Sequence, residues 1–514
     1  MTTDQTEQTR HDQQTFDSLS PMNGDVVGTH PVHSAEDVSA AVLRAQQEAA
    51  WWSALSHDER AELLQKWKGV ITRRLSQLAE LMHQETGKPH GDALLEASLA
   101  IDHLDWAAKN AGKVLKRRKV PSGLLMANQA ASVEYKPLGV VGVIGPWNYP
   151  VFTPMGSIAY ALAAGNAVVF KPSEYTPGVG EWLARTFREA VGRPVFTVVT
   201  GLGETGAALC HAGVDKVAFT GSTATGKRVM AACAEHLTPV VIEAGGKDAV
   251  IVDHDADVEA AADAVLWGAC ANAGQTCTGV ERVYVHEKVY DAFVAAVVKQ
   301  AETLRADESP DSPLGPITMP QQMDVIRSHI DDALARGGRA LVGGSGAVGD
   351  RFVQPTILVD VPEDSLAVCE ETFGPTVTIA RVGTVEEAIR RTNATAYGLG
   401  STVFSQARGM EIADKIRSGM TAINGVITFA AIPSLPFGGV GDSGFGRIHG
   451  PDGLKEFTYA KAIARQRFKP VMPLTSFKRT AKHEQQLVQM MTMLHGRGTT
   501  LPKAGKPVKK GRRS

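Results

Sequence analysis

The stretch Val140-Val141-Gly142-Val143-Ile144 is apolar at every position and rich in β-branched side chains. A strand without polar alternation is buried on both faces, which is typical of a parallel sheet covered by helices. Further apolar runs follow along the chain, and segments of helical character such as 180–191 and 204–211 separate them. The alternation predicts an α/β domain built on a parallel sheet. The further runs are 167–170, 195–199 and 216–219.

The same mixture of elements extends to both sides of this stretch. On the N-terminal side, Ser34 precedes Glu36 and Asp37, a pattern that favours the start of a helix. After Glu243 the alternation of helices and strands resumes, which predicts a second α/β domain. The other expected helices are 57–86, 92–114, 257–271 and 287–304, and the expected strands of the second domain are 282–285 and 376–379.

The composition favours an ordinary globular enzyme. Of 514 residues, 43% are hydrophobic and 21% are charged, and the formal net charge of −2 argues against a nucleic-acid binder. No apolar run reaches the roughly 18 residues that a membrane-spanning helix needs. The polar N-terminal segment lacks the apolar part of a signal peptide. The five cysteines form no CxxC pair, which indicates reduced thiols in the cytoplasm rather than a disulfide framework or a metal site.

The C-terminal residues differ from the rest of the chain. Positions 471–514 hold ten Lys or Arg and one acid, a net charge of +9 that leaves −11 for the remainder. We expect residues 1–15 and the Gly-, Pro- and Lys-rich terminus from Gly496 to be disordered. Apolar residues in this extension recur at helical spacing. That spacing fits an amphipathic helix that contacts a membrane or a partner, or a helix packed on its own domain. These residues are Leu487, Met490, Met491 and Leu494.

One thiol and one carboxylate stand out as candidate catalytic groups. Cys277 lies in Gly274-Gln275-Thr276-Cys277-Thr278-Gly279, between glycines and small hydroxyl residues. A lone cysteine is more often a buried small hydrophobe, but a thiol in such a loop is a candidate nucleophile. Glu243 lies 34 residues upstream, directly after an apolar run, and is a candidate general base. Together they suggest covalent catalysis with a step that activates water.

Polar residues also follow the first two strands. Pro146-Trp147-Asn148-Tyr149-Pro150 is a rigid loop that can aim Asn148 into a site as an oxyanion donor, although an ordinary turn asparagine is the alternative. Lys171-Pro172-Ser173-Glu174 ends the next strand. Because ligands bind beyond the carboxyl ends of parallel strands, Lys171 and Glu174 could hold ribose hydroxyls or form a surface ion pair.

Two glycine-rich segments follow strands as well. Gly201-Leu202-Gly203-Glu204-Thr205-Gly206 matches GxGxxG, and Gly221-Ser222-Thr223-Ala224-Thr225-Gly226-Lys227 nearly matches a P-loop. Each can present backbone N–H groups to a pyrophosphate, although glycines of tight turns explain either one alone. Arg228 stands where a P-loop requires Ser or Thr, which argues against an NTPase. Glu370–Pro375 adds a carboxylate and an aromatic side chain before a strand, or a charge pair at a helix end.

Jointly and in this order, these motifs resemble the aldehyde dehydrogenase superfamily over residues 16–468. Pro436-Phe437-Gly438-Gly439 adds to the resemblance. It implies an α/β fold with a Rossmann-type cofactor domain, an α/β catalytic domain and a β arm that pairs subunits into a homodimer or homotetramer. The cofactor domain would comprise 16–120 and 137–245, the catalytic domain 246–445, the arm 121–136 and 455–470, and the basic extension 471–514.

The resemblance also implies roles for the quoted residues. Cys277 would attack the aldehyde to give a thiohemiacetal and then a thioester. Asn148 and the backbone N–H of Cys277 would stabilise the oxyanion, and Glu243 would activate the hydrolytic water. No metal is implied. The residues expected to bind NAD or NADP are Ile144, Pro146, Trp147, Lys171, Ser173, Glu174, Gly203, Gly206, Gly221, Ser222, Gly226, Glu371 and Phe373.

Several positions depart from the family's pattern. Ser157 stands where many relatives have a lysine and Tyr459 where many have a glutamate, which leaves the proton relay open. Glu174 would repel a 2′-phosphate and therefore favours NAD over NADP. The apolar loop 426–432 favours an aliphatic or aromatic aldehyde. Succinic semialdehyde is the alternative substrate, and a catalytically weak binding or structural relative is the alternative class of function.

Overall fold

The computed structural model describes residues 14–309 and 311–496. Two compact units divide them: the larger comprises 14–116 and 135–460, and the smaller comprises 117–134 and 461–496. The larger unit contains both predicted α/β domains, each built on its own sheet. Most of the residues expected to be disordered, 1–13 and 497–514, lie outside the described part. However, β1 (Thr15–Leu19) already begins at Thr15, where it pairs with β2 (Val26–Pro31).

The first domain is built around β5 (Val140–Ile144), the strand that the sequence predicts to be buried on both faces. Its strand is parallel to β6 (Ala167–Lys171) on one side and β8 (Lys216–Gly221) on the other. The first four residues of β5 are buried, as the absence of polar alternation predicts. The sheet order is β17-β9-β8-β5-β6-β7, and β7 is Phe196–Val198.

Helices cover this sheet and begin at the capping residues that the sequence offers. Ser34 accepts a hydrogen bond from the backbone N–H of Asp37 and so caps α1 (Ala35–Ala54). The expected helix 57–86 is two helices, because Arg74 takes a non-helical conformation at φ −115° between them. The helices are α2 (His57–Arg73), α3 (Leu75–Thr86), α4 (His90–Leu115), α5 (Phe152–Ala164), α6 (Pro177–Val191), α7 (Gly203–His211) and α8 (Thr223–Ala234).

The chain returns to the first domain near its C-terminus. Strand β17 (Gly444–Phe445) pairs antiparallel with β9 (Val240–Ala244), and α15 (Gly450–Glu456) packs against α4 and α5. Phe457 is fully buried in the same core. The first domain therefore takes residues that the sequence argument placed in the catalytic domain and in the arm. A two-residue strand has no periodicity by which a sequence pattern could reveal it.

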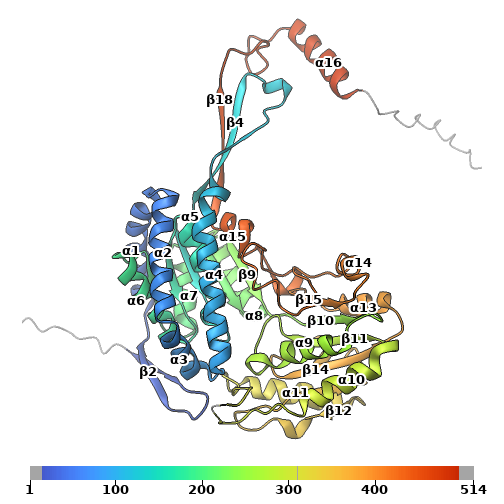
Figure 1. The fold of residues 1–514 in the computed structure, drawn as a ribbon. Helices are drawn as coiled ribbons and strands as arrows, with labels where there is room; N and C mark the ends of the chain where they lie inside the picture. The colour runs from blue at the N-terminus through green and yellow to red at the C-terminus, as the bar shows by residue number, and fades with distance from the viewer. Residues whose placement is uncertain (1–13, 310, 497–514) are drawn as a thin grey trace, which may run out of the picture. The chain divides into compact units, whose positions relative to one another are not determined.

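The second domain is built on a seven-stranded sheet of order β12-β13-β14-β11-β10-β15-β16. Its central strands are parallel, and α9 (Val258–Cys270) and α10 (Glu287–Ala301) pack on one another and on β11 (Figure 1). The strands are β10 (Asp248–Val252), β11 (Val280–His286), β12 (Arg339–Val342), β13 (Thr356–Val359), β14 (Thr376–Val382), β15 (Ser401–Phe404) and β16 (Ala422–Ile423). The remaining helices are α11 (Gln322–Ala335), α12 (Leu366–Cys369), α13 (Val385–Thr392) and α14 (Gly409–Ala413).

The smaller unit contains strands of the predicted arm and the C-terminal extension. Its sheet has the order β18-β4-β3, and it begins at Arg118, a few residues before the expected position. The extension forms the predicted helix, α16 (Ala481–His495), of which no residue is buried. Among the described residues, no helix is long and apolar enough to cross a bilayer. The strands are β3 (Arg118–Val120), β4 (Gln129–Pro137) and β18 (Thr458–Gln466).

Candidate active site

The carboxyl ends of β5, β6, β8 and β9 open onto a cavity of about 720 Å³. Segments of the second domain, including the Cys277 loop and the residues before β14, close its other side. The cavity thus collects side chains that lie far apart in the sequence. Of the predicted site residues, it is lined by Ile144, Pro146, Trp147, Asn148, Lys171, Ser173, Glu174, Gly203, Gly206, Gly221, Ser222, Glu243, Cys277, Glu371 and Phe373.

Gly226 is the predicted cofactor residue that does not line the cavity. It is buried in the first part of α8, and a Cβ atom there would lie 3.1 Å from Cγ2 of Ile242. Its small size therefore serves the packing of α8 on β9. Lys227 also lies away from the cavity, because its exposed ammonium group faces Asp442 at 3.6 Å. The P-loop interpretation has no structural support at either residue.

The turn before Cys277 has an unusual backbone. Asn272 and Ala273 have φ values of 54° and 55°, and Gly274 follows at 72°. Three consecutive left-handed residues are rare, and such strain is common at functional sites. At Gly274 a Cβ atom would lie 2.2 Å from the backbone of Gly374, so only glycine fits. This turn places the partly buried Cys277 at the cavity.

Glu243, at the end of β9, faces the thiol. Its side chain is buried, and neither carboxylate oxygen has a hydrogen-bond partner among the described residues. Burial raises the pKa of Glu243 to about 7, and the nearby Cys277 thiol and Thr220 hydroxyl offset part of that rise. Burial and the Glu243 carboxylate in turn raise the pKa of Cys277 well above its ordinary value. A neutral thiol therefore stands beside a carboxyl group that titrates near neutral pH.

The side chain of Asn148 is held against the loop that carries the thiol. Its amide nitrogen donates a hydrogen bond to the carbonyl oxygen of Gln275 at 2.9 Å. An asparagine amide has two N–H groups, so this bond uses one of them. Next to it, the hydroxyl groups of Tyr149 and Thr276 are 3.0 Å apart, which joins the Asn148 loop to the Cys277 loop a second time.

A buried ion pair that was not predicted from the sequence holds the backbone of the loop that carries Asn148. Lys88 and Glu96, both fully buried, form a salt bridge. The Lys88 ammonium also donates to the backbone carbonyl of Asn148 at 2.9 Å. Glu96 accepts the backbone N–H groups of Val151 at 2.8 Å and Phe152 at 3.1 Å. The pair thereby fixes both ends of the turn that leads from β5 into α5. The only signal in the sequence is a charged residue at an apolar position of a helical pattern.

A second missed pair fixes the segment that precedes β14. Lys247 and Glu281 form a buried salt bridge, and Lys247 also donates to the hydroxyl of Thr372 at 3.1 Å. Glu281 accepts the backbone N–H groups of Thr372 and Phe373 at 3.0 Å. These bonds hold Phe373 at a φ of 53°, with its ring edge-to-face with Trp147 at 5.5 Å. An aromatic wall of the cavity results.

Glu371 closes the cavity over the glycines that follow Glu243. Its carboxylate accepts the N–H of Gly246 at 2.9 Å. At Gly245, a Cβ atom would lie 2.1 Å from a Glu371 carboxylate oxygen, so a side chain there would displace it. Burial, together with the charge of Glu281, raises the pKa of Glu371 to about 8. Glycine at positions 245 and 246 therefore allows the Glu371 carboxyl group to lie close to the backbone.

The opposite end of the cavity has the chemistry that a dinucleotide requires. Gly203 and Gly206 lie in α7, and a Cβ atom at either position would meet nothing within 4 Å. Lys171 is buried with its ammonium 3.4 Å from the Glu174 carboxylate, and burial lowers the pKa of Lys171. Ser222 caps α8. Helix N-termini suit a pyrophosphate, and a lysine beside a carboxylate suits ribose hydroxyls. The residues present fit NAD or NADP.

The two positions that depart from the family's pattern do not line the cavity. Ser157 is buried within α5, whereas Tyr459 is half exposed on β18. Glu243 and Glu371 are thus the carboxyl groups with raised pKa that line the cavity, among the residues that the structure describes.

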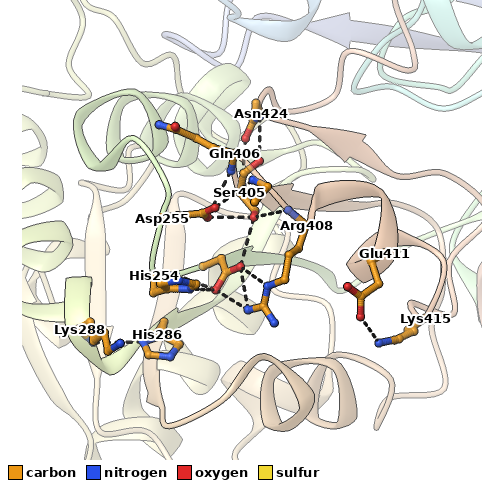
Figure 2. Close-up of polar contacts among 12 residues, drawn as sticks. His254, Asp255, His286, Lys288, Ser405, Gln406, Arg408, Glu411, Lys415 and Asn424 are labelled. Atoms are coloured by element: carbon orange, nitrogen blue, oxygen red, sulfur yellow. Dashed lines mark hydrogen bonds and ion pairs between the residues drawn. The ribbon is translucent and has the colours of Figure 1, made fainter.

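Two groups of described residues could offer ligands to a metal, and neither lines the cavity. Asp253, His254 and Asp255 already have partners, because Arg408 donates to Asp253 at 3.0 Å and Ser405 donates to Asp255 at 2.9 Å. Figure 2 shows Asp255, Ser405 and Arg408 converging from two segments. This cluster joins the loops that follow β10 and β15. The second group, formed by exposed residues at the ends of α7 and α8, is His211, Glu235 and His236.

Comparison with known proteins gives one consistent result. The model of the aldehyde dehydrogenase family matches residues 8–463. The chain is 36% identical to 4,4′-diapolycopene aldehyde oxidase of Methylomonas sp. over 91% of this chain and 87% of that protein. It is 35% identical to putative succinate-semialdehyde dehydrogenase [NADP(+)] 2 of Mycobacterium ulcerans (strain Agy99), over 86% of this chain and 87% of that protein.

Solved structures agree with the sequence comparisons. PnpE from Pseudomonas sp. WBC-3 superposes with a TM-score of 0.85 at 35% identity, over 91% of this chain and 96% of that chain. A structure of PnpE in complex with nicotinamide adenine dinucleotide superposes with a TM-score of 0.84 over the same shares of the two chains. At this identity and coverage, the similarity extends to the family as well as to the fold.

Proposed function

Since this chain belongs to the aldehyde dehydrogenase family and oxidises aldehydes with NAD or NADP, we propose that Cys277, Glu243 and Asn148 perform its chemistry. The observation that carries the proposal is the meeting of a thiol and a buried carboxyl group in a cavity that fits a dinucleotide. Each group has a property that one step of aldehyde oxidation needs.

The first step forms a bond between Cys277 and the aldehyde. Glu243 in its ionised form takes the thiol proton, and the sulfur attacks the carbonyl carbon. The carbonyl electron pair moves to oxygen, where the Asn148 amide and the backbone N–H of Cys277 donate hydrogen bonds to it. Because the Lys88–Glu96 pair holds the Asn148 loop, the donor is already oriented before the charge develops.

The second step removes hydride from the carbon bonded to sulfur. As the oxyanion re-forms the carbonyl group, hydride leaves that carbon and Cys277 is left as a thioester. NAD or NADP, when bound, accepts the hydride at its nicotinamide ring. Of the residues that line the cavity, Glu371 and Phe373 would hold the nicotinamide end of the cofactor, and Lys171 and Glu174 its adenosine end.

The third step hydrolyses the thioester. Glu243, after releasing to solvent the proton that it took from the thiol, takes a proton from water, whose oxygen adds to the thioester carbonyl. Collapse of this intermediate breaks the C–S bond, releases the carboxylic acid and returns the thiolate of Cys277. A pKa of about 7 suits Glu243 to accept a proton in this step and to release it again near neutral pH.

The preference for NAD over NADP rests on Glu174. If this carboxylate holds the adenosine ribose, it would repel a 2′-phosphate there; it pairs with the Lys171 ammonium at 3.4 Å. Relatives named for NADP and for NAD both exist. Glu174→Gln should therefore lower the KM for NADP more than the KM for NAD.

The substrate class rests on the apolar character of the surroundings. The segment after Asn148 offers no cation between Val151 and Met155, and the loop 426–432 is apolar. Both features favour an aliphatic or aromatic aldehyde over a carboxylate-bearing one. Succinic semialdehyde is the second candidate, because two of the relatives carry that name.

The decisive experiment is an assay of NAD and NADP reduction over a panel of neutral and carboxylate-bearing aldehydes. Cys277→Ala should abolish oxidation, whereas Cys369→Ala, at an exposed thiol outside the cavity, should leave it unchanged. Turnover of the Cys277 variant near the original rate would overturn the mechanism. Absence of any turnover in the original protein would favour the binding or structural class of function.

We further propose a homodimer or homotetramer that forms through the arm. Strand β18 is at the edge of the sheet β18-β4-β3, and an exposed edge strand is suited to pairing with another chain. All five cysteines are free, which is in keeping with a reducing compartment such as the cytoplasm. Light scattering after size-exclusion chromatography gives the number of subunits.

A further inference from the structure

One end of the cavity is lined by α7 and α8, two helices that pack against each other. The lining residues recur at helical spacing, so each helix turns one face toward the cavity. Most of these side chains are small, which leaves room for a flat group beside the helices. The proposed function places the adenosine part of the dinucleotide at this end. The lining residues are Gly203, Gly206, Ala207 and Cys210 on α7, and Thr225, Arg228, Val229 and Ala232 on α8.

A pair of thiols lies where these two helices meet. Cys210, near the end of α7, lines the cavity, and its thiol donates to the carbonyl oxygen of Gly206 at 3.4 Å. Cys233 lies in the last turn of α8, next to the lining residue Ala232. Both cysteines are only 1% exposed, and their thiols are in hydrogen-bond contact with each other. Neither thiol takes part in the mechanism proposed above.

The contact between the thiols makes one of them more reactive than the other. The hydrogen bond from Cys210 lowers the pKa of the Cys233 thiol. The bond with Cys233, together with burial, raises the pKa of Cys210. The thiolate therefore forms at Cys233, with a second thiol beside it. A thiolate next to a second thiol is the arrangement in which a peroxide produces a disulfide.

We propose that Cys210 and Cys233 form a dithiol that hydrogen peroxide oxidises to a disulfide, and that this disulfide weakens binding of the dinucleotide. The effect on binding rests on the proposed function, which puts the dinucleotide in this cavity. The oxidation itself depends only on the two thiols and on access from the cavity that Cys210 lines.

Two steps complete the oxidation. The Cys233 sulfur attacks one oxygen of hydrogen peroxide, the O–O bond breaks, and the hydroxide that leaves takes up a proton to become water. The sulfenic acid that remains on Cys233 is then attacked by the Cys210 sulfur. The S–O bond breaks, and the hydroxyl group leaves as a second water with the proton of the Cys210 thiol. Each sulfur is oxidised by one electron, and the peroxide is reduced by two.

The disulfide changes the end of the cavity that α7 and α8 line. The two sulfurs of a disulfide are about 2.05 Å apart, which is closer than two thiols in hydrogen-bond contact. The bond therefore draws the end of α7 toward the last turn of α8 and moves Cys210 from its place in the cavity wall. A cavity altered at this end fits the adenosine part less well. A small dithiol reductant reverses the change by thiol–disulfide exchange.

The test follows the disulfide and dinucleotide binding separately, in full-length protein that carries Cys277→Ala so that peroxide cannot act on the proposed nucleophile. After peroxide treatment, mass spectrometry should find the tryptic peptides 189–216 and 229–247, each with one cysteine, joined with the loss of two hydrogen atoms. Calorimetry should show a Kd about tenfold higher for NAD or NADP, whichever the reduced protein binds more tightly. Dithiothreitol should restore the original Kd.

Two further variants locate the effect. Cys233→Ala removes the pair without changing a residue that lines the cavity, so its Kd should be the same before and after peroxide. Cys270→Ala is the matched control, because it removes a cysteine that is equally buried in the core of the second domain. This variant should respond to peroxide as strongly as the protein with all four remaining cysteines.

The outcomes separate this proposal from the proposed function. Absence of the linked peptide, or an unchanged Kd in the linked protein, would overturn the proposal while leaving the cofactor site intact. An equal rise in Kd for Cys233→Ala would overturn it as well, because another group would then be responsible. Failure of the reduced protein to bind either dinucleotide would overturn the cofactor site, and with it the effect of the disulfide on binding.

Discussion

Replacement of the proposed base, Glu243→Gln, should stabilise the folded protein at alkaline pH. Burial raises the pKa of Glu243 from 4.5 to about 7. The folded protein therefore keeps this proton at pH values where the unfolded chain has released it. The preference of the folded state for the neutral carboxyl group contributes stability that is fully present below pH 4.5. This contribution is lost as the pH rises from 4.5 to 7. The full difference corresponds to about 3 kcal/mol. A glutamine, neutral at every pH, avoids this loss.

The assay is thermal unfolding of the original protein and the variant at pH 5 and pH 8. For a unit of this size, 3 kcal/mol corresponds to a rise in Tm of about 3 °C. We expect this rise at pH 8 and a rise of only about 1 °C at pH 5, where the unfolded chain has released part of this proton. Glu302→Gln, which makes the same change at an exposed position, should shift Tm equally little at both pH values. A Glu243 variant that is no more stable than the original at pH 8 would refute the reasoning from burial.

Three further variants test other parts of the site. Asn148→Ala should lower kcat about 10²- to 10³-fold with little change in KM for the aldehyde, and an unaltered kcat would remove its role as oxyanion donor. Gly245→Ala should raise KM for NAD more than tenfold, because its Cβ atom would displace Glu371. Gly91→Ala, where a Cβ atom meets nothing within 4 Å, is the control and should match the original. Lys88→Met leaves the buried Glu96 carboxylate without its ion-pair partner and should destabilise the protein by about 3–5 kcal/mol. A Tm within 1 °C of the original would contradict the role of this pair in holding the Asn148 loop.

The parts of the fold that depend on short-range patterns could be predicted from the sequence. Strands β5, β6 and β8 are apolar on both faces, and that pattern locates them and identifies the sheet as parallel. Because ligands gather at the carboxyl ends of such strands, the same pattern led to Asn148, Lys171 and Glu243. The aldehyde dehydrogenase family, the α/β fold and the aldehyde-oxidising activity are confirmed by the comparisons.

What could not be predicted depends on contacts between distant segments. Lys88 lies in the loop between α3 and α4, and Glu96 lies in α4; charged residues at such positions usually face solvent, and nothing local shows that these two are buried. Glu281 sits in the apolar strand β11, but its partner Lys247 is 34 residues away. Gly226 was predicted to bind the cofactor from the spacing of glycines, whereas its position reflects helix packing. Roles for individual site residues stay predictions until the variants are measured.

The carboxyl group of Glu371, which covers Gly245 and Gly246, can bind or release a proton inside the cavity near neutral pH. With a pKa of about 8, it is mostly protonated at pH 7. A positively charged nicotinamide ring nearby would favour its ionised form, so that cofactor uptake would expel a proton into the medium. The heat of NAD binding, measured at pH 7 in buffers of different ionisation enthalpy, should then depend on the buffer. Through this one side chain, the affinity of the protein for NAD would depend on pH, and binding of NAD would change the protonation of the protein.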